Sequence, residues 1–300
     1  MDLLDDLGAA AELAPWTLGP QIGRGGMGVV HRATEVATGA ARAIKFIPLL
    51  AVPDQAADAR IRREVESSLL LDRETVVRAY TGGRAGSTYF LVMELCSGGN
   101  LADAVRRDGP LAPEVTVAVL LDVLDGLAHA HSAPVPVATS RGQVDAVGLV
   151  HRDIKPPNIF VGQPAKIGDF GLAKAFATAG ISGLTRTGMV AGTPAYMPRT
   201  QVLDYRDAPP AVDVWAAAAS AYFALTGHSP RDFPAGRSPW RVVWDTAPVP
   251  IADRGVPVPP ALARVLDEAL DDRDDDLPHP GAGSLRAAVL AAGDADGISR

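Results

Sequence analysis

The stretch from residue 151 to residue 171 constrains this chain more than any other feature. It reads His151-Arg152-Asp153-Ile154-Lys155-Pro156-Pro157-Asn158 and, further on, Asp169-Phe170-Gly171. Asp153 is a candidate base that can take a proton from a hydroxyl. Asn158 and Asp169 offer hard oxygen ligands, which suit an ion that keeps several waters and also binds phosphate. Together they predict phosphoryl transfer, which needs a positioned hydroxyl and neutralised charge rather than covalent help from the protein.

A glycine-rich segment upstream predicts a phosphate-binding loop. Gly23 to Val30 fits the pattern G-x-G-x-x-G-x-V, which also opens dinucleotide-binding βαβ units. Here residues 29–34 read as a strand, Thr38-Gly39 as a turn, and residues 41–47 as a second strand. The sequence therefore predicts a glycine-tipped hairpin and not a glycine turn that opens a helix. Lys45 lies on the returning strand, where its ammonium can point at phosphate oxygens.

A helix is predicted after this hairpin, with Asp54 as a candidate N-cap. Its apolar residues recur every four positions, at Ile61, Val65 and Leu69. Glu64 lies on a flank of that apolar face, from which it can reach Lys45 and fix its rotamer. Glu66 is the alternative, but it lies two residues further around the helix and points elsewhere. We therefore prefer Glu64 as the partner of Lys45.

On these motifs the chain resembles the eukaryotic-type Ser/Thr protein kinases found in bacteria, from about Trp16 to about Ala292. Further motifs follow in the family's order: a hinge-like Leu91-Val92-Met93-Glu94-Leu95-Cys96, a substrate strip Gly192-Thr193-Pro194-Ala195-Tyr196, and Asp213-Val214-Trp215. The resemblance implies an α+β, bilobal protein-kinase-like fold, with a small mostly-β N-lobe and a larger mostly-α C-lobe. The expected divisions are a short leader (1–14), the N-lobe (15–96), the C-lobe (97–292) and a tail (293–300).

The resemblance also implies roles for the catalytic residues. Lys45 would contact the α- and β-phosphates of ATP, with Glu64 holding it. Asp153 would be the base, and Lys155 would meet the γ-phosphate. Thr193 would support the catalytic loop through its hydroxyl. Lys155 and Thr193 resemble the Ser/Thr branch of the family rather than the Tyr branch.

Cofactor and nucleotide contacts follow from the same resemblance. Asn158 and Asp169 would bind Mg²⁺, with Mn²⁺ as an alternative ion. Met93 resembles the gatekeeper, and the backbones of Glu94 and Cys96 would hydrogen-bond adenine. The other residues expected to contact ATP are Ile22, Gly23, Gly25, Gly28, Val30, Ala43 and Lys45.

Several positions depart from the family's pattern. Thr200 stands where the family has the Glu of Ala-Pro-Glu, and Leu277 stands where that Glu finds its Arg partner. Losing one partner alone would strand a buried charge at a cost of about 3–5 kcal/mol, so a joint loss is physically coherent. We therefore expect Thr200 and Leu277 to face each other in a largely apolar pocket. The family's His-Pro-Asn is also absent, replaced by Arg73-Glu74-Thr75.

Composition limits the location and the partners. The 300 residues are 47% hydrophobic, enough for one large domain or two lobes. Cys96 is the one cysteine, which excludes an intramolecular disulfide and fits a reducing cytosol. The acidic N-terminus lacks the basic start of a signal peptide, and the longest apolar stretch, 215–225, is too short to span a bilayer. With a net charge of −7, we expect a cytoplasmic protein without membrane insertion or a nucleic-acid partner.

Three other features of the sequence are predicted to be structural rather than catalytic. Residues 132–148 form an insertion before the catalytic loop, predicted to be a surface excursion with a small hairpin. His129 and His131 lack a third ligand and are interpreted as structural rather than metal-binding. The acidic run 271–276 lacks the glycine and distal glutamate of a calcium loop, so a solvated acidic turn is expected.

The predicted function is a kinase that transfers the γ-phosphoryl of Mg-ATP to Ser or Thr of protein substrates. Arg152 precedes the base, and family members with this Arg commonly use it to bind an activation-loop phosphate. Thr185 and Thr187 are the candidate autophosphorylation sites, with ordinary polar loop residues as the alternative. Regulatory input is expected from a separate protein. A nucleotide-binding pseudokinase or scaffold, and a small-molecule kinase on the same fold, remain as alternatives.

Overall fold

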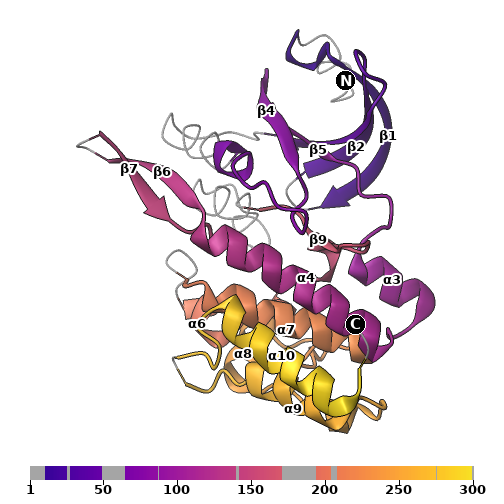
Figure 1. Cartoon of the computed structure of the whole chain (residues 1–300), viewed down its shortest axis with the longest axis vertical. Helices are drawn as coiled ribbons and strands as arrows, with labels where there is room; N and C mark the ends of the chain where they lie inside the picture. The colour runs from indigo at the N-terminus through magenta and orange to yellow at the C-terminus, as the bar shows by residue number, and fades with distance from the viewer. Residues whose placement is uncertain are drawn as a thin grey trace. The chain divides into compact units, whose positions relative to one another are not determined.

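The protein folds into two compact units in a computed structural model (Figure 1). The structure describes residues 11–25, 28–48, 65–86, 88–139, 142–170, 194–203, 208–274 and 276–298. Among these, the first unit holds residues up to Arg73, Val77–Ser97 and Phe170, and the second holds the remainder. These units differ from the expected lobes at residues 74–76, which belong to the helical unit, and at Ser97 and Phe170, which belong to the sheet unit.

A five-stranded antiparallel sheet forms the first unit (Figure 1). The strands lie in the order β1-β2-β3-β5-β4. Their bounds are β1 Trp16–Gly25, β2 Gly28–Glu35, β3 Ala41–Pro48, β4 Ala79–Ala85 and β5 Thr88–Glu94. Before β1, the 3-10 turn η1 (Ala11–Leu13) places Leu13 in the same core as Phe46 and Phe90. Leu13 is thus a core residue, although it falls in the stretch expected to be a leader.

The predicted glycine-tipped hairpin is confirmed by the pairing of β2 with β3, in which Val30 lies opposite Lys45. Gly28 has φ +143°, and a Cβ there would lie 2.0 Å from the carbonyl oxygen of Phe46. Only glycine fits that combination of backbone angle and close approach. The predicted helix after the hairpin is described over residues 65–68 alone, and the preferred Glu64 lies outside the described residues.

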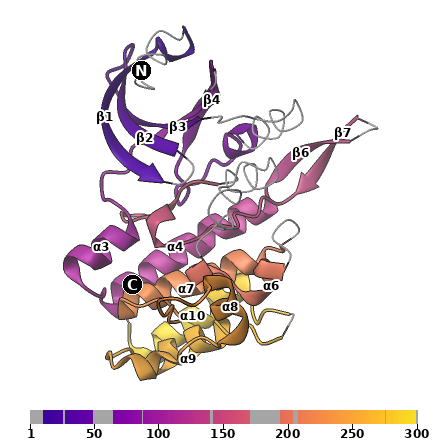
Figure 2. The same cartoon turned by 180° about the vertical axis from the view of Figure 1, so that it is seen from behind.

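The second unit is mostly helical (Figure 2). Its helices are α3 Leu101–Asp108, α4 Pro113–Ser132, α6 Arg199–Leu203, α7 Ala211–Thr226, α8 Pro239–Asp245, α9 Pro260–Ala269 and α10 Ala282–Asp296. α7 is buried over nearly its whole length and packs against α4 and α9. α10 continues past the expected boundary at residue 292, and Gly293 is buried, so residues 293–296 of the expected tail are part of this helix.

α4 is long and apolar enough to cross a membrane by length and composition. Within the second unit it is instead a core helix, because it packs against α7 and α10. Val123, Leu124 and Leu127 on this helix are each exposed by 1% or less. Pro113 begins the helix, as expected for a residue whose missing N–H costs nothing in the first turn.

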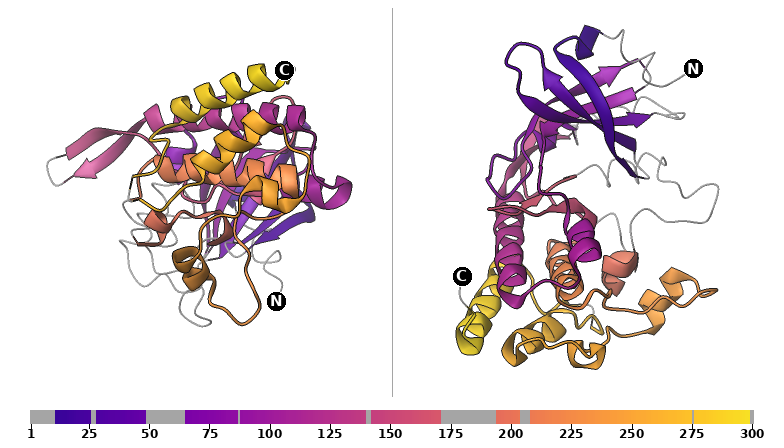
Figure 3. Two further views of the ribbon diagram at one scale, coloured as in Figure 1. Left: turned by 90° about the horizontal axis from the view of Figure 1, so that it is seen from below. Right: turned by 90° about the vertical axis from the view of Figure 1, so that its right-hand side faces the viewer.

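The predicted hairpin in the 132–148 insertion is confirmed. Strands β6 (Pro134–Thr139) and β7 (Gly142–Val147) pair antiparallel, with Thr139 opposite Gly142. Figure 3 shows the hairpin extending beyond the end of α4, away from the other helices of the second unit.

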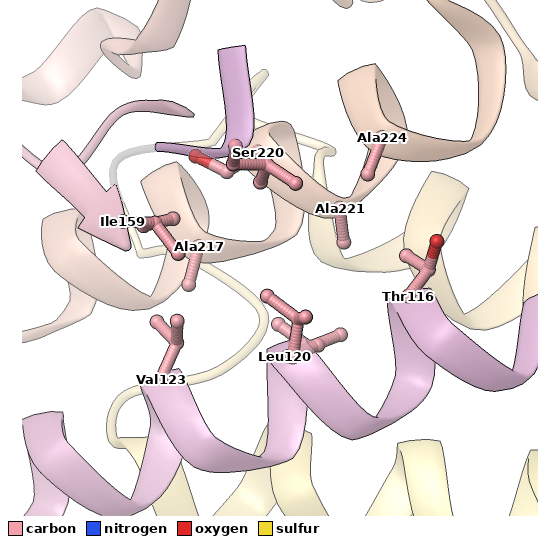
Figure 4. Close-up of a pocket in the computed structure, with 10 residues that line it drawn as sticks. Thr116, Leu120, Val123, Ile159, Ala217, Ser220, Ala221 and Ala224 are labelled. Atoms are coloured by element: carbon pink, nitrogen blue, oxygen red, sulfur yellow. The ribbon is translucent and has the colours of Figure 1, made fainter. Parts of the chain in front are cut away.

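A small cavity lies between α4, α7 and strand β8 (Ile159–Phe160), lined by Thr116, Ala217 and Ser220 among others (Figure 4). Its volume is about 10 Å³, room for one water molecule. Within the part of the chain that the structure describes, the hydroxyl of Thr116 is buried there without a hydrogen-bond partner. This cavity is too small for a nucleotide, so it is not a candidate active site.

Candidate active site

The backbone of the catalytic loop is hydrogen-bonded to Asp213, which lies in the first turn of α7. Its carboxylate accepts backbone N–H groups from His151 and Arg152, both at 2.7 Å, and Nε2 of His131 at 2.8 Å. Burial acts to raise the pKa of Asp213, but the hydrogen bond and charge of His131 and the contacts with His151 outweigh burial and lower it. The histidine interpreted as structural therefore has a defined contact, which is a hydrogen bond to this buried carboxylate.

Two residues of the site have left-handed backbone conformations. Arg152 has φ +64° and Asp169 has φ +63°. Such a backbone is costly for residues other than glycine and persists only where neighbouring contacts enforce it. At Arg152 the contact is the N–H to Asp213, at 2.7 Å.

His151 joins the catalytic loop to the segment that precedes Asp169. Its Nδ1 lies 3.2 Å from the N–H of Asp153, and its Nε2 lies 2.8 Å from the carbonyl of Gly168. Because Nδ1 must accept and Nε2 must donate, the ring is the neutral tautomer protonated at Nε2. The two segments of the site are thereby held together through one buried side chain.

Asp153, Lys155 and Asn158 form a compact polar cluster. The ammonium of Lys155 donates to the two carboxylate oxygens of Asp153 at 3.0 and 2.8 Å. Nδ2 of Asn158 donates to the backbone carbonyl of Asp153 at 2.8 Å and to its carboxylate at 3.3 Å. Asp153 is 8% exposed. The arrangement places a buried carboxylate beside an ammonium, which suits a candidate base for a hydroxyl.

The two predicted metal ligands are tied to one another through the backbone. The N–H of Gly168, the residue before Asp169, donates to the carbonyl of Asn158 at 2.9 Å. The short strands β8 and β9 (Lys166–Ile167) pair between them. Because the amide nitrogen of Asn158 is engaged with Asp153, its oxygen is turned to the other side, where it is available for a cation.

These two oxygen ligands fit magnesium, which keeps several waters and shares its shell with phosphate. Among the described residues, no three His, Cys, Asp or Glu side chains gather as a metal-binding group. A site of one carboxylate and one amide therefore suits an ion that binds together with a nucleotide and not a closed structural metal centre.

In the first unit, the residues predicted to contact ATP share one face of the sheet. Val30 lies opposite Lys45, and Ala43 lies opposite Met93. Directly opposed residues point to the same side, and so do residues two apart on one strand. Val30, Ala43, Lys45 and Met93 therefore line one continuous surface, on which Lys45 is 5% exposed.

The hinge and the glycine loop border this surface. The N–H of Glu94 donates to the carbonyl of Arg78 at 2.8 Å, so the carbonyl of Glu94 is its candidate contact for adenine. Cys96 is partly buried. Ile22, 49% exposed, precedes Gly23. A Cβ at Gly25 would meet nothing within 4 Å, so among the described loop glycines only Gly28 is required sterically.

Four predicted residues lie outside the described residues: Glu64, Thr193, Thr185 and Thr187. Their roles stay predictions. Glu66, the alternative partner of Lys45, is exposed.

The region behind the substrate strip is not wholly apolar, and the expected contact of Thr200 with Leu277 stays a prediction. Asp272 is 1% exposed and pairs with Arg231, and it also accepts the N–H of Arg199 at 2.9 Å. The acidic run is therefore not solvated throughout, since this one aspartate folds inward. The hydroxyl of Thr200 is buried without a hydrogen-bond partner among the described residues, and Leu277 is partly exposed.

Thr75, in the segment that stands where the family has His-Pro-Asn, contacts the helical unit. Oγ1 of Thr75 donates to the carboxylate of Asp125 on α4 at 2.8 Å, and the carbonyl of Thr75 accepts the N–H of Ile167 at 2.9 Å. Thr75 is thus anchored to the helical unit, which explains why residues 74–76 belong there.

An antiparallel sheet unit with a glycine-tipped hairpin, and a helical unit with a candidate base, an ammonium and two candidate cation ligands, form the arrangement expected of a protein kinase domain. Residues 16–242 match the family described as protein kinase domain. The chain therefore belongs to the protein kinase family.

The similar proteins of bacteria carry the same class in their names. Serine/threonine-protein kinase PknL of Mycobacterium bovis (strain ATCC BAA-935 / AF2122/97) is 38% identical over 212 residues, 70% of this chain and 49% of that protein. Serine/threonine-protein kinase PknB of Mycolicibacterium smegmatis (strain ATCC 700084 / mc(2)155) is 31% identical over 288 residues, 92% of this chain and 42% of that protein. The chain spans about half the length of the curated relatives it matches. The predicted resemblance to bacterial Ser/Thr kinases is confirmed.

A solved structure shares the fold. The crystal structure of Rad53 1-466 in complex with AMP-PNP matches with a TM-score of 0.69 at 23% identity, covering 92% of this chain and 65% of that chain. The predicted protein kinase fold, with its β-rich first part and helical second part, is confirmed.

Proposed function

We propose that this chain transfers the γ-phosphoryl group of ATP to Ser and Thr hydroxyls of protein substrates, itself included. The observation that carries the proposal is the Asp153–Lys155–Asn158 cluster, in which a buried carboxylate lies beside an ammonium and an amide. The reaction class also agrees with the names of the relatives, which are serine/threonine-protein kinases.

In the proposed reaction, the oxygen of the substrate hydroxyl bonds to the γ-phosphorus, and Asp153 accepts the proton of that hydroxyl. The bond between that phosphorus and the bridging oxygen of the β-phosphate breaks, and ADP leaves. Lys155, which already contacts Asp153 at 2.8 Å, neutralises charge on the transferring group. Asp153 thus orients and deprotonates the hydroxyl, and Lys155 stabilises the transition state.

The first unit holds the nucleotide in this proposal. Lys45 binds the α- and β-phosphates, with Glu64 as its partner. The face that carries Val30, Ala43 and Met93 covers the adenine, with the hinge supplying its hydrogen bonds. The complex of Rad53 with AMP-PNP supports ATP as the nucleotide class.

Asn158 and Asp169 would hold Mg²⁺, with Mn²⁺ as an alternative. The ion would neutralise the phosphate oxygens and orient them for in-line transfer. The two residues contribute by holding their positions. The side chain of Asn158 is fixed by its hydrogen bond to Asp153, and Asp169 comes directly after Gly168, whose N–H donates to the carbonyl of Asn158.

Regulation through the activation segment is also proposed. Arg152 is 8% exposed, and its Nε has no hydrogen-bond partner in the described part of the chain. A buried guanidinium nitrogen without a partner is a site for an anion such as phosphothreonine. Thr185 and Thr187 are the candidate phosphorylation sites. The chain itself adds the phosphate in this proposal, and a separate protein supplies further regulatory input.

We propose a cytoplasmic location, which agrees with the use of ATP and with a single cysteine.

The alternative of a pseudokinase was supported by the absence of the family's ion pair at Thr200 and Leu277. The buried Arg231–Asp272 pair weakens that support, because the region keeps its charge pairing.

The proposal is tested with purified protein, labelled Mg-ATP and a generic basic protein. We expect label on both the basic protein and the chain, with Asp153→Asn as the inactive control. Peptide mass spectrometry of the wild type should find phosphate at Thr185 or Thr187, absent from Asp153→Asn. A wild type that binds ATP but labels nothing would mean that the pseudokinase alternative is right.

A further inference from the structure

Behind the substrate strip the protein buries a charged pair that lies outside all of the motifs named above. Arg231 and Asp272 are each 1% exposed, and Nη2 of Arg231 donates to both carboxylate oxygens at 2.6 Å. Nε of Arg231 donates to the carbonyl of Thr246 at 2.9 Å, and its guanidinium lies 5.4 Å from the ring centre of Trp215. Two desolvated ions are tolerated only with partners of this quality.

Asp272 also fixes the start of α6. Its Oδ2 accepts the N–H of Arg199, the first residue of that helix, at 2.9 Å. Arg199 follows the substrate strip after only Met197 and Pro198. The side-chain Nε of Arg199 donates to the carbonyl of Val243 at 3.2 Å. The chain that leaves the substrate strip is thereby attached to a buried carboxylate.

From α6 the contacts continue to the catalytic loop. Gln201 is 1% exposed, and its Nε2 donates to the carbonyl of Arg152 at 2.7 Å. Arg152 directly precedes the proposed base, Asp153. A continuous set of contacts therefore runs from Asp272 through a single short helix to the residue next to the base.

We propose that Arg231 and Asp272 are positioning residues, which hold the substrate strip in register with Asp153. They take over the task of the Glu–Arg pair that the family's pattern places at Thr200 and Leu277. Compared with the family's pair, the two charges lie at different places in the sequence. The carboxylate of Asp272 lies near the end of the domain, and the guanidinium of Arg231 lies in the segment after α7. The inference rests on the proposed function.

Asp272→Asn is the first test, because it keeps the side chain's shape and leaves Arg231 buried without a counter-charge. We expect kcat/KM for a protein substrate to fall about tenfold or more through KM, with KM for ATP within about twofold of wild type. Amide exchange in a peptide spanning residues 194–203 should quicken, because Arg199 loses its charged acceptor. Tm should fall by about 10 °C.

The double variant Arg231→Met with Asp272→Leu separates positioning from stability. Removing both charges together should restore most of the Tm that each single variant loses. The double variant still lacks an acceptor for the N–H of Arg199. Fast exchange over residues 194–203 and a raised KM for the protein substrate should therefore remain.

Two controls match these variants. Asp245→Asn removes the exposed ion pair with Arg237, at 2.9 Å, and should leave Tm, exchange and KM unchanged. Val289→Ala removes buried volume from α10 and should lower Tm without changing the KM for the protein substrate or exchange over residues 194–203.

A purely structural pair would lower Tm in the single variants and leave both KM and exchange at wild-type values in the folded double variant. That result would overturn the proposal. If the wild type transferred no phosphate to proteins, the proposed function would fall, and exchange over residues 194–203 would still decide whether the pair holds α6.

Discussion

The catalytic loop and the region behind the substrate strip both bury charged side chains, but they recruit them differently. In the catalytic loop, Asp153, Lys155 and Asn158 lie within one short stretch, and Lys155 and Asn158 each contact Asp153 directly. Behind the strip, Arg231 and Asp272 come from distant parts of the chain. A base and its cation must meet fixed atoms of a substrate, so residue type and spacing are set by chemistry. A support needs only neutralised charge and a filled volume, so several arrangements satisfy it.

The sharpest way to break this comparison is to remove the base. Asp153→Asn should reduce phosphoryl transfer by about 10²–10⁴-fold, because an amide cannot accept the hydroxyl proton. Nucleotide affinity, measured by titration with a fluorescent ATP analogue, should stay nearly unchanged. Wild-type turnover in this variant would show that the role assigned to Asp153 is wrong.

The support beneath the catalytic loop gives the next largest effect. Asp213→Asn should cost about 3 kcal/mol of unfolding free energy at pH 7, since His131 and two backbone N–H groups lose a charged acceptor. Denaturant melts of the two proteins provide the measurement. Activity should fall as well, because the N–H of Arg152 is held by this carboxylate.

The contacts of Asp213 also predict how the stability of the protein depends on pH. Burial acts to raise the pKa of Asp213, but His131 and His151 lower it below its ordinary value of 3.8. The stability from Asp213 is therefore complete above about pH 4 and is lost as the pH falls through the lower, folded-state pKa. The free-energy gap between wild type and Asp213→Asn should shrink only in that acid range. Asp276→Asn, at an exposed position, is the control and should open no gap. A gap that closes near pH 6 would contradict the assignment to Asp213.

The ligand pair gives a smaller and more specific change. Asp169→Asn should raise the magnesium concentration for half-maximal activity by about tenfold or more, because a charged ligand becomes neutral. A magnesium titration of the labelling assay measures this, and Asp276→Asn should match the wild type. An unchanged magnesium requirement would place the cation on other residues.

The sequence was sufficient for the parts of the fold that follow local patterns. The hairpin of β2 and β3 was predicted from glycine and strand signals around Gly28, and the hairpin in the insertion from its turn residues. The order of motifs predicted the family. The roles of the catalytic residues stay predictions until the variants above are measured.

The sequence was not sufficient for contacts between distant residues. Nothing near Asp272 distinguishes it from the exposed Asp274 and Asp276, because inward folding depends on a guanidinium that comes from another segment. His131 was read as structural without its partner, Asp213, for the same reason. A signal was available in the case of Asp213, since it lies in a motif of the family. Arg231 carried none.

The smallest effect comes from Thr75, in the segment that stands where the family has His-Pro-Asn. Thr75→Val keeps the shape of the side chain and removes the hydroxyl that donates to Asp125 at 2.8 Å. We expect a loss of about 1–2 kcal/mol in unfolding free energy, because a partly buried carboxylate loses one donor. Thr88→Val on β5, also buried, is the matched control in the other unit and reports on a hydroxyl without this carboxylate. A double-mutant cycle with Asp125→Asn should give a coupling energy of about 1 kcal/mol. Additive losses would show that Thr75 does not anchor residues 74–76 through Asp125, and the comparison would then rest on Arg231 and Asp272 alone.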